Sequence, residues 1–296
     1  MILLTGVTGT IGAEVLRRMP AGAAVRALVR DPSRVPGTPA PVEVVPGDYA
    51  DPASLAAALR GVHTAFLVTS RVGGDDDAAF LAAARAADVR RVVKLSAAAV
   101  ADPAADDAIT RWQRRSEELL RDSGLEWTLL RPRAFMSNTL SWAGSIRAEG
   151  VVRALYGRAP NACVDPRDVA EVAVAALIGE GHGSRIHTLT GPEPVTAVRQ
   201  TEELSRVLGI PLRFEELTVD AARTALCARY PRWLAEALLR GAERQRDGAK
   251  ADVTGTVRAV TGRPARSFPA WAAGHRAAFA PAPERTGPAR GQSLRP

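Results

Sequence analysis

MILLTGVTGTIG, residues 1–12, is the stretch that decides the fold of this chain. It opens with four apolar residues, which predict a buried strand, and the glycines Gly6, Gly9 and Gly12 follow at regular spacing. A helix is expected over residues 11–19. A glycine turn between a strand and a helix lets backbone N–H groups and the helix N-terminus approach a pyrophosphate. These residues therefore predict a dinucleotide-binding turn.

The first half of the chain alternates short apolar runs with helical patterns. Strands are predicted at 1–4, 24–29, 42–45, 64–69, 91–96 and 127–130, with helices between them at 51–60, 75–87 and 109–122. Strands separated by helices at this spacing form right-handed units around a parallel sheet. The sequence thus predicts an α/β fold with a doubly wound parallel sheet, the Rossmann arrangement.

Beyond residue 132 the pattern becomes mostly helical. Helices are predicted at 135–148, 165–178, 198–208, 221–244 (interrupted at Pro231) and within 262–279, and strands at 185–190 and 212–217. We expect a dinucleotide-binding core at 1–132 and a smaller, mostly helical C-terminal substrate lobe, interleaved with the core, at 133–280. Residues 281–296 carry four prolines among polar residues, which predicts a disordered tail.

The composition argues against several classes of function. Lysine and arginine number 39 against 32 acidic residues, but only Lys94 and Lys250 are lysines, and no basic run marks a nucleic-acid surface. No apolar stretch approaches the ~20 residues of a membrane span, and the predicted first strand leaves no signal peptide. Cys163 and Cys227 alone favour a reducing cytoplasm over a disulfide framework. The four histidines are scattered, so no metal site is expected.

Arg30 closes the second predicted strand, at the position that selects between dinucleotides. An acidic residue there would bind the ribose hydroxyls of NAD, whereas an arginine can pair with the 2′-phosphate of NADP. Asp31 follows, and we expect it to cap a turn ahead of Pro32. The alternative is that Arg30 is simply an exposed arginine. The charge at this position favours NADP(H).

Two further segments are predicted to line the cofactor. Gly47, Asp48 and Tyr49 follow the third strand, and residues 67–70 end the fourth, where open α/β sheets bind ligands. The backbone of that segment, with Thr69, is expected to flank the ribose near the nicotinamide. The complete predicted cofactor set is Gly6, Thr8, Gly9, Thr10, Ile11, Gly12, Arg30, Asp48, Tyr49, Val68, Thr69, Ser70 and Ser96.

The glycine turn resembles that of a known family. Its TGxTGxxG pattern, in place of GxGxxG, is similar to that of the atypical, NmrA-like short-chain dehydrogenase/reductases. GDYADPASL at 47–55 and GLEWTLLRPRAFMSN at 124–138 extend the resemblance, which covers about residues 1–280. The resemblance implies an NADP(H)-binding Rossmann protein with a small-molecule substrate. It also implies that Asp48 accepts from the adenine amino group, a plain turn aspartate being the alternative.

The catalytic residues depart from those of most short-chain reductases, which pair a tyrosine with a lysine four residues later. None of the three tyrosines here has such a lysine. Ser96 ends the fifth strand at the usual serine position, and Gln113 stands where NmrA-like relatives commonly have a histidine. Both can polarise a carbonyl by hydrogen bonding, and neither titrates near neutrality. The alternatives are a strand-end cap for Ser96 and, for Lys94, a surface or sheet-edge charge in place of a catalytic role.

The predicted substrate pocket is lined by Phe135, Met136, Asn138 and Trp142, with packing of the lobe interface as the alternative for each apolar one. The favoured interpretation is an NADPH-dependent oxidoreductase that reduces a carbonyl, enone or quinone of a small aromatic or polyketide-like metabolite. It is expected to be a cytoplasmic monomer or homodimer without nucleic-acid or membrane partners. The alternatives are a non-catalytic NADP(H)-binding redox sensor and an isomerase, dehydratase or cyclase, because a fold alone does not fix a function.

Overall fold

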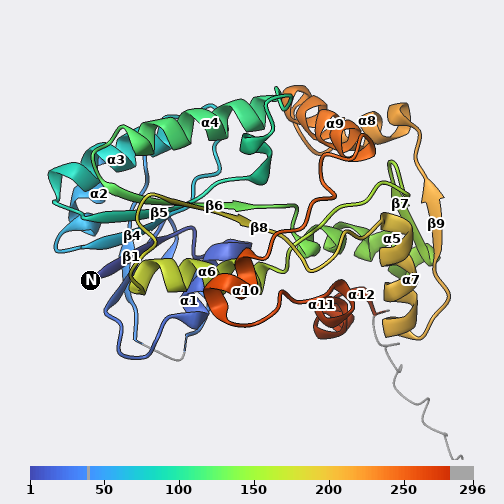
Figure 1. Ribbon diagram of the computed structural model, residues 1–296, viewed down its shortest axis with the longest axis horizontal. Coiled ribbons are helices and arrows are strands. Elements are labelled where there is room, and N and C mark those ends of the chain that lie inside the picture. Colours follow the sequence, from blue (N-terminus) through green and yellow to red (C-terminus); the bar gives the residue numbers. More distant parts are fainter. Residues whose placement is uncertain (39–40, 281–296) are drawn as a thin grey trace, which may run out of the picture.

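Figure 1 shows a computed structural model of the chain, which describes residues 1–38 and 41–280. Among these residues, seven parallel strands form one sheet in the order β3-β2-β1-β4-β5-β6-β8. The strands are β1 (Ile2–Thr5), β2 (Val25–Val29), β3 (Glu43–Pro46), β4 (Thr64–Leu67), β5 (Arg91–Leu95), β6 (Glu126–Pro132) and β8 (Arg185–Leu189). The strand order reverses between β1 and β4, which is where open α/β sheets bind ligands. The predicted doubly wound parallel sheet is confirmed.

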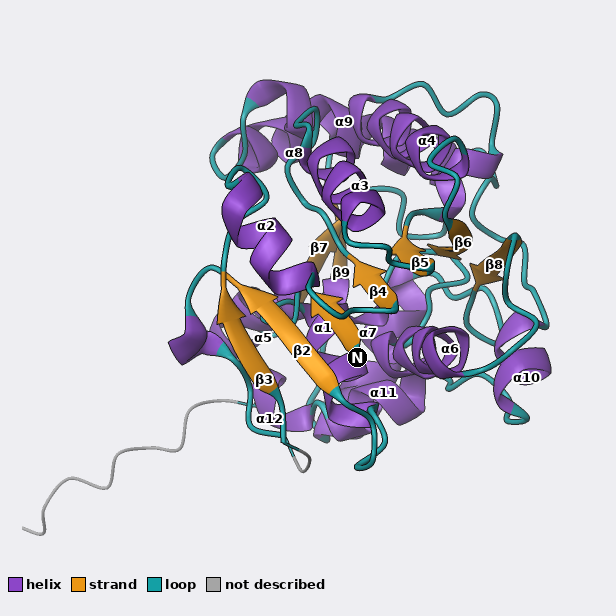
Figure 2. Cartoon of the chain, turned by 90° about the vertical axis from the view of Figure 1, so that its left-hand side faces the viewer, coloured by secondary structure: helices purple, strands orange, loops and turns teal. Residues whose placement is uncertain are grey.

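Helices cover both faces of this sheet (Figures 1 and 2). One layer holds α2 (Pro52–Leu59), α3 (Asp76–Ala86) and α4 (Ala108–Arg121), and the other holds α1 (Thr10–Arg18), α6 (Pro166–Ile178) and α10 (Thr256–Thr261). Each layer buries its own apolar cluster against the sheet. Phe80 and Leu120 belong to the first cluster, and Val15 and Val169 to the second. Burial of these side chains is the main term that stabilises the fold.

The residues after 132 build a further lobe, at the right of Figure 1. It contains the parallel pair β7 (Val151–Ala154) and β9 (Arg213–Glu216), with helices α5 (Ala143–Glu149), α7 (Ala197–Leu208), α8 (Val219–Cys227), α9 (Arg232–Arg246), α11 (Phe268–Gly274) and α12 (Arg276–Phe279). A third apolar cluster, around Met136, Trp271 and Phe279, is the centre of this lobe. Strand β8 and helix α6, although they follow residue 132, return to the central sheet.

The structure corrects the sequence analysis in the lobe. The predicted helix over 135–148 is wrong in its first half, where Met136–Trp142 is a 3-10 helix and α5 begins only at Ala143. There the hydroxyl groups of Thr139 and Ser141 donate to the carbonyl oxygens of Met136 and Asn138, and such bonds compete with α-helical ones. Strand β7 was not predicted. The interruption at Pro231 is confirmed, since α8 ends at Cys227 and α9 begins at Arg232. The predicted tail at 281–296 lies outside the described residues.

Candidate active site

The glycine turn after β1 closes so tightly that Gly6 and Gly12 could not carry side chains without strain. Gly6 has a φ of +67°, in the left-handed region that favours glycine. A Cβ atom on Gly12 would lie 2.2 Å from the carbonyl oxygen of Gly6. Gly9, the N-cap of α1, supplies no side-chain cap, which leaves the first amide groups of α1 to a ligand. The turn therefore fits a dinucleotide pyrophosphate.

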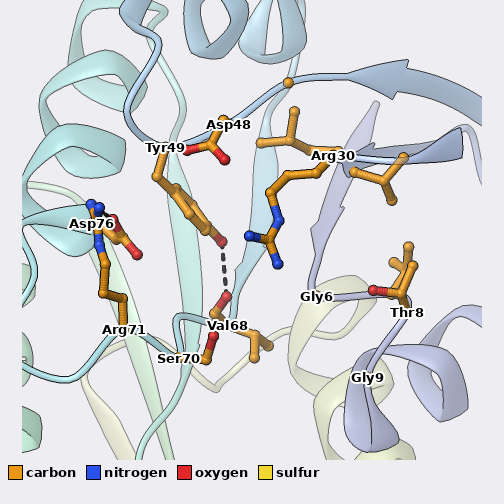
Figure 3. Close-up of a pocket in the computed structure, with 14 residues that line it drawn as sticks. Gly6, Thr8, Gly9, Arg30, Asp48, Tyr49, Val68, Ser70, Arg71 and Asp76 are labelled. Atoms are coloured by element: carbon orange, nitrogen blue, oxygen red, sulfur yellow. Dashed lines mark hydrogen bonds and ion pairs between the residues drawn. The ribbon is translucent and has the colours of Figure 1, made fainter.

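A pocket of about 300 Å³ opens beside this turn, at the ends of the first four strands (Figure 3). Its lining residues are Gly6, Val7, Thr8, Gly9, Leu28, Val29, Arg30, Gly47, Asp48, Tyr49, Val68, Ser70, Arg71 and Asp76. The Arg30 guanidinium extends into the pocket between Tyr49 and Thr8. A pocket that joins the glycine turn to the end of β2 matches the path of the adenosine half of a dinucleotide. The residues present fit NAD(P)H.

The carboxylate of Asp31, beside Arg30, is hydrogen-bonded within a local turn. Its Oδ1 atom accepts hydrogen bonds from the backbone N–H of Ser33 at 3.0 Å and from the Ser33 hydroxyl at 2.7 Å. These bonds hold the pKa of Asp31 below its usual value. The expected turn cap is confirmed, at the start of the 3-10 helix Pro32–Arg34. Asp31 does not line the pocket, so Arg30 supplies the cationic charge at the end of β2.

Tyr49 forms a wall of the pocket and is not free to act as an acid. Its hydroxyl donates to the carbonyl oxygen of Val68 at 2.8 Å, drawn as a dashed line in Figure 3. Burial raises the pKa of Tyr49. The Val68 backbone is also held by β1, because its N–H donates to the hydroxyl of Thr5 at 2.8 Å. The loop after β4 is thus fixed against β1 and β3.

Other predicted cofactor residues lie outside this pocket. Thr10 lines a separate hollow on the other side of the turn, and Ile11 and Gly12 are buried in α1. The Thr69 side chain is buried and its hydroxyl donates to Asp77 at 2.9 Å, so only its backbone can face the cofactor. The pocket also contains a pair that sequence reasoning missed. Arg71 and Asp76 form an ion pair at its edge, and the only signal was the acidic start of the helix.

Lys94 is fully buried, so the expectation of a surface or sheet-edge charge is wrong. Its Nζ atom lies 2.5 Å from Oδ1 of Asp77, and Oδ2 of the same carboxylate accepts from the hydroxyl groups of Thr69 and Ser116. Removing one partner of such a buried pair leaves an uncompensated charge. This network ties β5 to α3 and α4 directly beneath the loop that follows β4.

Ser96 and Gln113, the two predicted catalytic residues, differ in their hydrogen bonding. The Ser96 hydroxyl donates to Glu117 at 2.5 Å, and Arg131 in turn donates to Glu117 at 2.5 Å and 2.8 Å. Gln113 is 8% exposed, and its Oε1 atom has no hydrogen-bond partner among the described residues. A buried amide without a partner is costly unless a ligand satisfies it. Gln113 is therefore better placed than Ser96 to form a hydrogen bond with a ligand.

The four predicted substrate residues lie in different surroundings. Met136 lies in the third apolar cluster, and Trp142 packs against that cluster. Phe135 packs against the sheet, and Asn138 is exposed. None of the four lines the pocket beside the glycine turn. A more apolar hollow, of about 390 Å³, lies instead between the loop after β4, α4 and α9, where Trp112 and Trp233 face it.

No helix in the described ranges is long and apolar enough to cross a membrane. Within the same ranges, no group of three or more histidine, cysteine or acidic side chains is arranged to hold a metal ion. The charged side chains of the site are instead paired with one another or face the pocket.

Comparisons with known proteins agree with this geometry. A family described as NAD(P)H-binding matches residues 6–179. The (4-alkanoyl-5-oxo-2,5-dihydrofuran-3-yl)methyl phosphate reductase of Streptomyces griseus is 60% identical, over 95% of this chain and 100% of its own length. The NAD(P)H azoreductase of Xenophilus azovorans is 36% identical, over 94% and 99% of the two chains.

A solved structure shares the fold. The NADPH-dependent quinone oxidoreductase QOR2 of Escherichia coli, complexed with NADPH, superposes with a TM-score of 0.80 at 24% identity. The match covers 93% of this chain and 99% of that one, so the central sheet and the helical lobe belong to one shared architecture.

Proposed function

The chain belongs to the NAD(P)H-binding family and is an NAD(P)H-dependent oxidoreductase; from this premise we propose that it reduces the ring double bond of a butenolide phosphate with NADPH. The observation that carries the proposal is the full-length similarity to the Streptomyces griseus reductase. The name of that enzyme's substrate describes an unsaturated five-membered lactone with a ring acyl group and a phosphomethyl group. This is an activated enone, one of the acceptor classes expected from the sequence.

Arg30 supports NADPH as the preferred donor. Its guanidinium enters the pocket at the end of β2 without a described hydrogen-bond partner, and the neighbouring acid is bound to Ser33. A guanidinium there can pair with a 2′-phosphate, which NADH lacks. The cofactor supplies hydride when bound, and the chain positions it through the glycine turn and the loop after β4.

The proposed reaction needs little acid catalysis from the protein. Hydride addition to the ring carbon that bears the phosphomethyl group breaks the double bond and leaves an electron pair on the neighbouring carbon. That pair is delocalised over the lactone and acyl carbonyls, and one proton from water completes the reduction. The side-chain N–H of Gln113 is proposed to donate to one of these carbonyl oxygens as negative charge develops there, since the unpartnered Oε1 atom of the same amide can only accept. Ser96 is proposed to position this region through Glu117.

The remaining substrate group is an alkyl chain. We assign it to the hollow faced by Trp112 and Trp233, because an apolar chain is more stable against aromatic side chains than in water. Phe135, Met136, Asn138 and Trp142 stay predictions as pocket residues. Cytoplasmic location and a monomer or homodimer also stay predictions.

Turnover with purified protein tests the proposal. NADPH consumption is followed with a butenolide phosphate, with a quinone and with an azo dye as separate acceptors. One NADPH consumed for each saturated lactone, at a rate well above those of the quinone and the dye, is expected. A preference for the quinone would redirect the proposal to quinone reduction. Product formed without NADPH consumption would favour the isomerase, dehydratase or cyclase alternative.

A further inference from the structure

Three cationic side chains from two distant parts of the chain converge beyond the end of β6. Arg133 follows the last residue of β6, Arg244 lies in the last turns of α9, and Lys250 follows that helix. The backbone of Lys250 accepts from Ala162 N–H at 2.8 Å, and its Nζ atom lies 3.7 Å from where a Cβ atom on Gly241 would stand. The ammonium therefore lies against α9, near Arg244.

Much of this cation cluster (Arg133, Arg244 and Lys250) lacks protein partners. The Nε atoms of Arg133 and Arg244 are buried and have no hydrogen-bond partner in the described part of the chain. No hydrogen bond or ion pair joins the Arg133 guanidinium or the Lys250 ammonium to another described side chain. Buried donors left this way are costly, which points to a ligand that accepts from them.

Of the three acids near the cluster, only Asp107 and Asp102 form ion pairs with it, and both pair with Arg244. Asp107 accepts from Arg244 at 2.9 Å, Asp102 lies 3.6 Å from the same guanidinium, and Asp252 is exposed near Arg133. Burial, together with the charges of Arg244 and Arg133, lowers the pKa of Lys250 to about 8. Burial also lowers the pKa of Arg133. The two arginines thus destabilise the charge on Lys250.

The cluster is too far along the sheet to serve the dinucleotide phosphates. The glycine turn follows β1, and three strand spacings separate β1 from β6 in the order β1-β4-β5-β6. At about 4.8 Å per spacing, the two strands are roughly 14 Å apart. Both strands end at the same edge of the sheet, so the cluster lies beyond the cofactor, on the side of the lobe. In Figure 1, α9 lies at the end of the molecule toward which β6 runs.

We propose that Arg133, Lys250 and Arg244 bind the phosphate group of the substrate and hold the reacting lactone toward the cofactor. This assignment rests on the proposed function, which supplies a substrate with a phosphomonoester. Arg133 and Lys250 carry two charges without an ion-pair partner, and a phosphomonoester carries close to two negative charges at neutral pH. The Arg133 fork can donate two parallel hydrogen bonds to phosphate oxygens, and Lys250 acts as a point charge.

The kinetic test compares a butenolide phosphate with its dephosphorylated alcohol. The wild-type ratio of their kcat/KM values is expected to favour the phosphate at least about 100-fold, and Lys250→Gln or Arg133→Gln to lower that ratio about 10- to 100-fold, the range for a charge-assisted contact. Arg240→Gln removes an exposed arginine from α9, the helix that carries Arg244, and is expected to keep the wild-type ratio. Equal use of both substrates by the wild type, or an unchanged ratio in both variants, would overturn the assignment and leave the reductase proposal intact.

A binding test covers the case in which neither lactone is reduced, where the reductase proposal fails. Inorganic phosphate is titrated into protein saturated with NADP⁺, so that the glycine turn and Arg30 are occupied. Phosphate is expected to raise the melting temperature of the wild type and of Arg240→Gln, and not that of Lys250→Gln. Lys250→Gln is also expected to melt higher than the wild type without phosphate at pH 7, because it removes a crowded charge. An equal phosphate response in Lys250→Gln would refute the phosphate site whatever the enzyme reduces.

Discussion

The hydroxyl of Ser96 donates a 2.5 Å hydrogen bond to the carboxylate of Glu117, and both side chains are buried. Glu117 is held in turn by Arg131 and Arg121. The serine at the end of β5 is therefore committed to a structural charge network, whereas Gln113, on the same helix as Glu117, keeps an unpartnered amide oxygen. This difference separates the effects expected of the two residues.

Gln113→Leu is expected to lower kcat about 10- to 100-fold, at or below the low end of a dedicated general acid, because it removes only a hydrogen bond to a delocalised charge. Ser96→Ala is expected to lower kcat no more than about 10-fold, since it acts through Glu117. Steady-state kinetics with a butenolide phosphate measure both. A loss near 10,000-fold in either variant, of the order of the strongest acid–base contributions, would point to a proton donor that the account lacks.

Arg30→Ala is expected to weaken NADPH binding by about 1.5–3 kcal/mol, the range for hydrogen bonds to charged groups. NADH binding is expected to change little, because NADH has no 2′-phosphate for the guanidinium. Calorimetry with both dinucleotides checks this. Arg34→Ala, which removes an arginine of the adjacent 3-10 helix outside the pocket lining, is the matched control. Equal losses of NADPH and NADH affinity in Arg30→Ala would remove the assignment of Arg30 to the phosphate.

Substitutions of Gly9 and Gly12 are expected to have different effects, one on cofactor binding and the other on the stability of the fold. A Cβ atom on Gly9 would lie 3.3 Å from the Gly6 carbonyl oxygen, a tight contact that small shifts relieve, so Gly9→Val should fold and lose dinucleotide binding. On Gly12 the same atom would lie 2.2 Å from that oxygen, so Gly12→Ala should destabilise the fold by about 1–3 kcal/mol, as overpacking does. Thermal melts and NADPH titrations separate the two effects. Tight NADPH binding by Gly9→Val would show that this turn is not the cofactor site.

The pH profile is expected to depend on the substrate phosphate. Lys250 loses its proton as pH rises through about 8, and a phosphomonoester loses its second negative charge as pH falls through about 6. Because kcat/KM reports free enzyme and free substrate, its value for the phosphorylated lactone should be highest between these limits and fall on both sides. Lys250→Arg should move the alkaline fall to higher pH. An alkaline fall that stays in place in Lys250→Arg would assign it to another group.

The sequence was sufficient to predict those parts of the molecule that depend on local sequence patterns. Glycine spacing, apolar runs and helix caps predict the turn after β1, the parallel sheet and the Asp31 cap, because each depends on residues close in the chain. The 3-10 helix at Met136–Trp142 was missed because hydroxyl-to-carbonyl bonds there outweigh helical periodicity.

Contacts between distant residues could not be predicted in the same way. Nothing near Lys94 in the sequence shows that Asp77 will bury its charge. The cation cluster likewise requires the folded arrangement of β6 and α9, since Arg133 is more than a hundred residues from Arg244 and Lys250 in the chain. The candidate pocket was predictable where a family motif covers it, as at Gly6, Arg30 and Asp48, and not at its edge, where Arg71 and Asp76 form an ion pair.

Hydride transfer is the central claim, and isotope transfer measures it most directly. NADPH carrying deuterium at the transferable nicotinamide position is incubated with the enzyme and a butenolide phosphate, and the product is examined by mass spectrometry and NMR. We predict one deuterium per product molecule, on the ring carbon that bears the phosphomethyl group, when the label is on one face of the nicotinamide and none when it is on the other. A saturated product without deuterium from either label would contradict this prediction.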